Sequence, residues 1–173
     1  MKVIKLILSI VIPFYVIVAI FVTACLIGYN DYNITEFGKK SLIIVEDDSL
    51  KPYFNEGDLL VVTKNNNADV KVNDKIFFYN NYNKEVSVNL AKVLKTERIT
   101  DSESTFTVDG NYDVSSEYFI GKEDTTVLYP KVGSVLNVLT SKYGYLFIFI
   151  LPILLLFLGE IFAIIKEVKN YED

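Results

Sequence analysis

Two long apolar runs lie near the two ends of the chain. The first, from Leu6 to Ile27, contains no charged residue. Its roughly 22 residues would reach about 33 Å as a helix, and the hydrocarbon core of a bilayer is about 30 Å thick. The second runs from about Tyr143 to Ile165 and contains one proline, Pro152, and one acidic residue, Glu160. Each run therefore predicts a transmembrane helix.

The first run could instead be a cleaved secretory signal. Such a signal has an apolar stretch of only about 7 to 15 residues, followed by a small-x-small cleavage site. The run here is longer, and the sequence at its end, Cys25-Leu26-Ile27-Gly28, offers no such site. We therefore expect an uncleaved membrane anchor.

The second run contains two residues that are unusual in a membrane helix. Pro152 is tolerated if neighbouring groups or local backbone adjustments satisfy the carbonyl that it frees. Glu160 is costly in hydrocarbon, so it is protonated, pairs with a polar group or lies shallow near the interface. The shallow position is the expected one because Lys166 follows within two helical turns. Tyr143 and Tyr145 stand where an interfacial aromatic belt is expected.

The charges that flank the two runs predict the topology. Lys2 and Lys5 precede the first run, and Lys166 and Lys169 follow the second. Positive flanks favour the cytoplasm, so both termini should be cytoplasmic, in an integral protein of the plasma membrane. The predicted parts are a cytoplasmic N-terminus (1–5), a transmembrane helix (6–27), an extracytoplasmic domain (30–142), a transmembrane helix (143–165) and a cytoplasmic tail (166–173).

The region between the two spans consists of short runs rich in β-branched and aromatic residues. Clusters of Asn, Asp and Gly separate these runs and favour turns. No helical stripe of useful length is visible between the spans. The pattern predicts a mainly antiparallel β domain, closed or folded over so that its sheet edges are protected. The predicted strands are Ser41–Val45, Leu59–Thr63, Lys75–Tyr79, Glu85–Leu94, Thr105–Val108 and Thr125–Leu128.

Composition excludes several classes of function for the central region. Residues 30–142 contain 13 basic and 18 acidic residues, which does not provide the basic face that nucleic-acid binding needs. The chain has no histidine, which removes the usual zinc sites and any Ser-His-Asp triad. The single cysteine, Cys25, lies in the first span, so the domain has no disulfide. We expect no metal and no cofactor.

One serine stands in a stretch that combines two turns with an apolar strand. It is Ser49, in the sequence Ser49-Leu50-Lys51-Pro52. Pro52 disfavours the helical region for Lys51, so this segment should be extended or turned. Gly57 suits a second turn that needs positive φ. On these local features alone, Ser49 is more often a turn residue than a nucleophile.

The order of these pieces resembles the signal peptidase I family. That family has a membrane anchor, a Ser-Met-x-Pro box, a Gly-Asp turn before an apolar strand, and further short boxes downstream. A second membrane helix at the C-terminus is similar to the endoplasmic-reticulum-type branch. The resemblance implies a signal-peptidase-like antiparallel β fold. The stretches that carry it are Ser49–Pro52, Gly57–Val62, Val72–Phe78, Asp109–Asn111 and Pro130–Gly133.

The resemblance implies that Ser49 attacks the peptide carbonyl after a small residue in the signal sequence of an exported protein. A serine hydroxyl needs a base, and the family places a lysine or a histidine in the strand that matches residues 88–94. Here that position holds Ala91 and the next holds Lys92. Neighbouring side chains of a strand point to opposite faces, so a shift of one residue from position 91 would turn the Lys92 amine away from the site. Lys92 is therefore either a candidate base or a solvated lysine. Lys84 and Lys95 are weaker candidates.

The sequence also departs from the family near the serine and after the glycine turn. Asp47 and Asp48 stand where small or hydroxyl residues help to hold the developing oxyanion. Asp113 is the candidate acidic partner of the base, although it comes earlier than in the family. Ser116 and Glu117 are nearer to the expected spacing.

Three interpretations remain open. The first is a membrane signal peptidase that acts through Ser49. The second is a catalytically inactive relative that binds peptides or a partner subunit, for which an exposed sheet edge is sufficient. The third is an unrelated membrane-tethered β domain. The expected partners are signal peptides of exported preproteins, the lipid bilayer and an accessory membrane subunit, with no nucleic acid.

Overall fold

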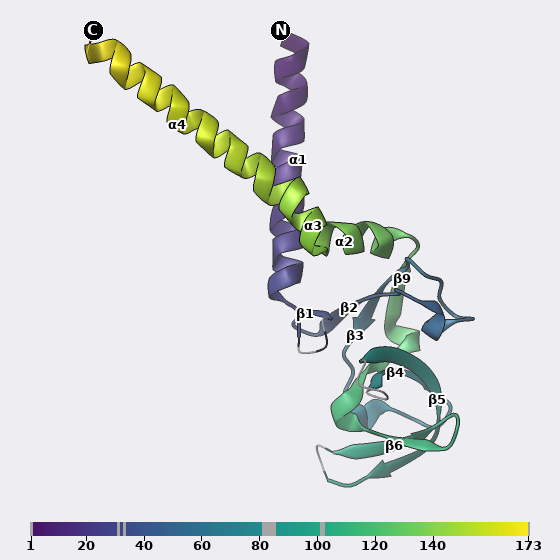
Figure 1. The fold of residues 1–173 in the computed structure, drawn as a ribbon. Helices are drawn as coiled ribbons and strands as arrows, with labels where there is room; N and C mark the ends of the chain where they lie inside the picture. The colour runs from purple at the N-terminus through teal and green to yellow at the C-terminus, as the bar shows by residue number, and fades with distance from the viewer. Residues whose placement is uncertain (1, 31, 33, 81–85, 101–102, 173) are drawn as a thin grey trace. The chain divides into compact units, whose positions relative to one another are not determined.

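The chain folds into two compact units. The computed structural model describes the backbone of residues 2–30, 32, 34–80, 86–100 and 103–172. One unit, Cys25–Leu136, is the β domain. The other contains the N-terminal segment to Ala24 and the C-terminal segment from Asn137, and it is helical (Figure 1).

The β domain contains two antiparallel sheets (Figure 1), so the prediction of a mainly antiparallel β domain is confirmed. The four-stranded sheet has the order β1 (Thr35–Phe37), β2 (Lys40–Ile44), β3 (Leu59–Thr63) and β9 (Thr126–Tyr129). The five-stranded sheet has the order β7 (Tyr112–Ser115), β6 (Ser104–Val108), β5 (Ser87–Arg98), β4 (Lys75–Asn80) and β8 (Phe119–Lys122).

The strands agree with the predicted ones where the sequence is strongly apolar. All six predicted strands are present, and β3 has the predicted bounds. β5 begins at Ser87 and extends beyond its predicted end to Arg98, whereas the predicted start, Glu85, lies outside the described residues. Three further strands, β1, β7 and β8, were not predicted. They are only three or four residues long, too short to show a clear alternation.

Short helical turns connect several of the strands, and one longer helix corrects the prediction. The 3-10 turns are η1 (Asp48–Leu50), η2 (Asn67–Asp69), η4 (Ser116–Tyr118) and η5 (Glu123–Thr125).

The prediction that no useful helix lies between the spans is wrong, because α2 covers Val132–Thr140. The sequence does not predict α2 because its first turn contains Gly133 and Ser134, which are weak helix formers. The helix buries Leu136, which packs near Leu59.

Strand β4 lies at the centre of the core because both of its faces are buried. Phe77 and Tyr79 belong to a first cluster of apolar side chains, whereas Ile76 and Phe78 belong to a second. Alternate residues of a strand point to opposite faces, so one strand contributes to both clusters. The first cluster contains Ile34, Ile43, Val45, Leu50, Phe54, Leu60, Val62, Phe77, Tyr79 and Ile120. The second contains Val70, Ile76, Phe78, Val93, Phe106, Val108, Val114 and Phe119.

Gly121 of β8 allows the two sheets to approach each other. A Cβ atom at this position would lie 2.6 Å from the carbonyl oxygen of Thr63 and 2.6 Å from Cγ1 of Val62. Both of these residues belong to β3. Any larger residue would therefore force β8 away from β3.

The helical unit contains two helices that are long and apolar enough to cross a membrane. By length and composition these are Ser9–Ile27 and Lys142–Lys169. The first lies in α1 (Lys2–Ile27), and the second combines α3 (Lys142–Tyr145), a π-helical turn η6 (Leu146–Ile150) and α4 (Leu151–Glu172). The predicted C-terminal tail continues α4 as far as Glu172. The topology and the plasma membrane stay predictions.

The carbonyl that Pro152 frees has a partner from the other helix. Proline lacks the N–H that would bond to Ile148, four residues earlier. The Tyr15 hydroxyl of α1 donates to the Ile148 carbonyl oxygen at 2.7 Å. A second polar contact between the helices joins the hydroxyls of Thr23 and Tyr145 at 2.8 Å. The expectation that a neighbouring group compensates for Pro152 is thus confirmed.

Glu160 is exposed on α4 and forms no ion pair with any described residue.

Replacing Tyr15 by phenylalanine should weaken the pairing of α1 with the C-terminal helix. The change leaves the Ile148 carbonyl without its donor, at an expected cost of about 1 kcal/mol. The measurement is unfolding by sodium dodecyl sulfate in mixed micelles. Tyr143→Phe is the matched control, because Tyr143 is 69% exposed. Equal unfolding midpoints for the two variants would contradict the role of Tyr15.

Candidate functional site

Ser49 lies in the one-turn helix η1, which is anchored by its neighbour. Leu50 is 2% exposed and belongs to the first cluster, whereas Ser49 itself is exposed. Lys51, before Pro52, has φ −67° and ψ 149°, which is extended, as predicted. The buried leucine and the extended lysine therefore fix a tight turn that presents the serine hydroxyl at the surface.

The Gly57-Asp58 turn that follows is built around a buried carboxylate. Gly57 has φ +88°, which confirms the predicted positive φ. Asp58 is 3% exposed, and its carboxylate accepts hydrogen bonds from the backbone N–H of Asn55 at 3.0 Å and of Lys131 at 3.2 Å. The sequence assigned no role to Asp58, although its place after a turn glycine and before an apolar strand could have indicated one. Asp58 connects the serine segment to the stretch before α2.

Gly133 places the first turn of α2 directly on the Gly57-Asp58 turn. A Cβ atom on Gly133 would lie 2.4 Å from the carbonyl oxygen of Asp58. The backbone N–H of Ser134 donates to the carbonyl oxygen of Gly57 at 3.0 Å. Two stretches that are far apart in the sequence, Gly57-Asp58 and Pro130–Gly133, are therefore in contact in the β domain.

The serine turn lies beside strand β5, and the strand register identifies the face of β5 that it covers. Leu90 pairs with Phe77 of β4 and packs against the first cluster, to which Leu50 of the serine turn belongs. Lys92 lies two residues after Leu90 and therefore shares its face. Lys92, paired with Lys75 of β4, thus lies on the face of β5 that the serine turn covers.

Ala91 lies on the opposite face of β5. It pairs with Ile76 and packs against the second cluster. The resemblance to the family puts the base position at Ala91, whereas the structure places Ala91 on the face of β5 opposite to that of Leu90 and Lys92. Lys92 as the base stays a prediction, with the strand register in its favour. Its side chain is exposed.

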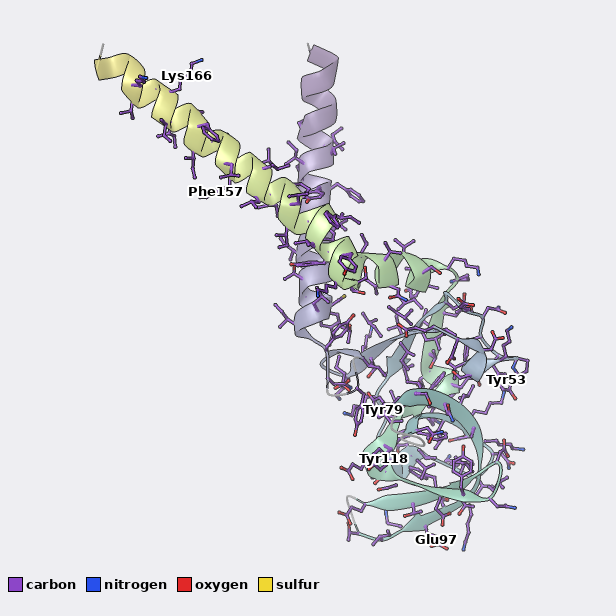
Figure 2. The ribbon with its side chains drawn as sticks, in the orientation of Figure 1. Tyr53, Tyr79, Glu97, Tyr118, Phe157 and Lys166 are labelled. Carbon is purple, nitrogen blue, oxygen red and sulfur yellow. The ribbon has the colours of Figure 1, made fainter. Side chains whose placement is uncertain are left out.

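Lys75 adds a second amine to this face. Its Nζ lies 3.9 Å from the centre of the Tyr53 ring, in the serine segment. Figure 2 shows Tyr53 at the edge of the β domain, and its side chain is exposed. A cation over an aromatic ring is attracted by the ring electrons. The contact therefore connects the serine segment to the sheet on the same face as Lys92.

The two aspartates before Ser49 have different partners. Asp48 forms an ion pair with Lys51 at 2.8 Å, with both side chains more than half exposed. Asp47 accepts a hydrogen bond from the backbone N–H of Ser49 at 2.8 Å. Hydrogen bonding to Ser49, through its side chain first and its backbone second, holds the pKa of Asp47 below its ordinary value. The Asp47 carboxylate therefore uses the hydrogen bond of the Ser49 backbone N–H, which is a donor that an oxyanion would need.

The candidate acidic partner, Asp113, has another neighbour. It lies exposed on β7 and accepts a hydrogen bond from the Thr107 hydroxyl at 2.7 Å. Among the described contacts, none joins Asp113 to Ser49 or Lys92. Lys95 is paired with Glu97, and its hydrogen bond to Glu97 raises its pKa above the ordinary value.

The remaining candidates contribute less. Lys84 lies outside the described residues. The Ser116 hydroxyl accepts from the backbone N–H of Ser104 at 3.0 Å, and Glu117 is exposed in η4. Within the described part of the chain, no group of three or more Cys, Asp or Glu side chains is placed to hold a metal ion.

Comparison with known proteins gives no family assignment. No protein-family model matches the chain, and no curated protein matches it. The site is thus characterised by its geometry: an exposed serine on a tight turn lies next to strand β5, one face of which contains Leu90 and Lys92.

Proposed function

We propose that this chain is a membrane-anchored serine endopeptidase of the signal peptidase I type, with a signal-peptidase-like β domain. The observation that carries the proposal is the position of the Ser49 turn beside β5, on the face that contains Lys92. Two apolar helices support an attachment to the bilayer, where signal peptides of exported preproteins reside. The β domain lies on the extracytoplasmic side, with both termini in the cytoplasm.

The proposed reaction is acyl transfer through Ser49. Its Oγ attacks the carbonyl carbon of the scissile bond, and the proton passes to a neutral Lys92 Nζ. The tetrahedral intermediate collapses to an ester on Ser49, and the leaving amine takes the proton from the Lys92 ammonium. Water then attacks the ester with Lys92 as base, which releases the carboxylate product and regenerates the serine.

The exposed state of Lys92 sets a condition on this reaction. Near neutral pH, a lysine is largely neutral only where burial or a nearby positive charge disfavours its charged form. An extended peptide that covers the face around Leu90 would exclude water from the amine. Binding of the preprotein is therefore part of the activation, and the free chain should react slowly with small reagents.

The second candidate function is a catalytically inactive relative that binds peptides or an accessory membrane subunit. The observation that favours it is the hydrogen bond from the Ser49 N–H to Asp47. A carboxylate at this place competes with the oxyanion of the intermediate. An extended segment could still pair with an edge strand such as β9, most of whose residues are exposed.

The test of the enzyme is cleavage of a preprotein by the purified full chain in detergent. We expect one cut after a small-x-small motif, and loss of cleavage in Ser49→Ala because the nucleophile is removed. Ser115→Ala is the control, since Ser115 is an exposed serine on β7. Cleavage that persists in Ser49→Ala would reject the nucleophile. Saturable binding of a signal peptide without any cleavage would favour the inactive relative.

A further inference from the structure

A pocket of about 210 Å³ lies where the two sheets of the β domain meet. Its walls come from β1 and β2 of one sheet, and from β4 and β8 of the other. It is separate from the serine turn: Tyr79 lines the pocket and Tyr53 belongs to the serine segment, and Figure 2 shows these residues on different sides of the domain. The proposed peptidase reaction makes no use of it.

One wall of the pocket is a fixed network of aromatic and polar side chains. The rings of Tyr32 and Tyr79 stack with their centres 4.2 Å apart. The Tyr79 hydroxyl accepts from Asn30 Nδ2 at 2.7 Å and donates to Glu36 Oε1 at 3.4 Å. Asn30 Nδ2 also donates to Glu36 Oε1 at 2.8 Å. Burial raises the pKa of Tyr79 to about 12, so its hydroxyl stays a donor and orients the Glu36 carboxylate.

Three polar side chains that line the pocket, Glu36, Ser41 and Glu117, have bonding capacity that the described residues do not use. Ser41 is 3% exposed and lines the pocket, yet its hydroxyl forms no hydrogen bond with any described residue. Neither Glu36 nor Glu117 forms an ion pair with a described cation. Lys64 is the one cation among the described lining residues. The pocket thus offers more negative charge and more acceptors than its own donors use. No described side-chain nitrogen or oxygen that is fully enclosed lacks a partner, so the unpaired Ser41 hydroxyl is open to the pocket and available to a ligand there.

We propose that this pocket binds a guanidinium or primary ammonium group, either on a polypeptide side chain or on a small free amine. The carboxylates of Glu36 and Glu117 would accept its N–H groups in charge-assisted hydrogen bonds. The Tyr32 ring offers a face for a cation–π contact. The Ser41 hydroxyl adds an acceptor. The volume suits one basic side chain or a compact amine.

The test is titration of the full chain in detergent with two probes, followed by calorimetry. One probe is N-acetyl-arginine amide, and the other is a five-residue peptide with one central arginine between alanines. We expect saturable binding, with affinity reduced at least about tenfold in the double variant Glu36→Gln, Glu117→Gln. Glutamine at position 36 keeps the Oε1 acceptor for Asn30 and Tyr79, so the wall should remain intact.

The controls separate the pocket from general charge effects and identify the source of the cation. Glu97→Gln makes the same chemical change at a distant exposed residue (Figure 2) and should bind as the parent chain does. Ser41→Ala should also weaken binding. Tighter binding of the peptide indicates a polypeptide side chain, whereas equal binding of both probes indicates that a small free cation is sufficient. Absence of saturable binding by either probe, or unchanged affinity in the double variant, would overturn the proposal. Ser49→Ala should not affect this binding, so the result is independent of the peptidase proposal.

Discussion

Replacing Phe77 by alanine is expected to lower the free energy of unfolding of the β domain by about 3 to 5 kcal/mol. Phe77 is 0% exposed and lies on the central strand β4, in the first cluster. Its ring centre is 5.8 Å from that of Phe54 in the serine segment. The variant should therefore loosen both the sheet and the segment that follows Ser49.

The measurement is denaturant-induced unfolding of the full chain in detergent, followed by near-ultraviolet circular dichroism of its tyrosines. Phe37→Ala is the matched control, because Phe37 is 39% exposed at the end of the edge strand β1. Its expected cost is about 1 kcal/mol or less. Equal destabilisation by the two changes would show that Phe77 is not a centre of the core.

Replacing Lys92 is expected to have the largest effect on catalysis. If Lys92 is the general base, Lys92→Ala should lower kcat by about a hundredfold to ten-thousandfold. Lys92→Arg should lose as much, because a guanidinium keeps the charge but cannot accept a proton at accessible pH. The measurement is kcat and KM for preprotein cleavage across a range of alkaline pH, where the rate of the parent chain should rise. An arginine variant that retains the parental kcat would show that the charge, and not proton transfer, is what matters.

Ala91→Lys provides the complementary test of the strand register. Ala91 packs against the second cluster, so a lysine there would bring an ammonium group into an apolar environment. The expected result is destabilisation without any gain of cleavage. A large gain of cleavage would mean that position 91 faces Ser49 and that the register is shifted by one residue.

The β strands were predictable from the sequence because their apolar residues are clustered and bounded by turn residues. Leu59–Thr63 is a run of apolar, mostly β-branched residues after Gly57-Asp58, and it forms β3. The apolar run Ile76 to Tyr79 fits a strand that is buried on both faces, as β4 is. By contrast, α2 was missed because it is nine residues long and its stability depends on contacts such as that of Gly133 with the Asp58 turn.

The candidate site was only partly predictable, because most of its geometry depends on contacts between residues that are far apart in the sequence. Pro52 predicted an extended Lys51, and Gly57 predicted a turn with positive φ. Both backbone conformations are confirmed. The choice between Ala91 and Lys92 depended on which face of β5 the serine turn covers, and this is set by the packing of Leu50 rather than by spacing. The double acceptor role of Asp58 depends on Lys131, which is far away in the sequence.

The most direct measurement of the central claim is trapping of the acyl group on its way through Ser49. Preprotein is incubated with the purified full chain in the presence of hydroxylamine, and the released signal peptide is analysed by mass spectrometry. An ester on Ser49 predicts a signal-peptide hydroxamate beside the ordinary carboxylate, and both products should be absent in Ser49→Ala. If the chain releases no signal peptide from any preprotein, or if Ser49→Ala still releases it, acyl transfer through Ser49 is contradicted.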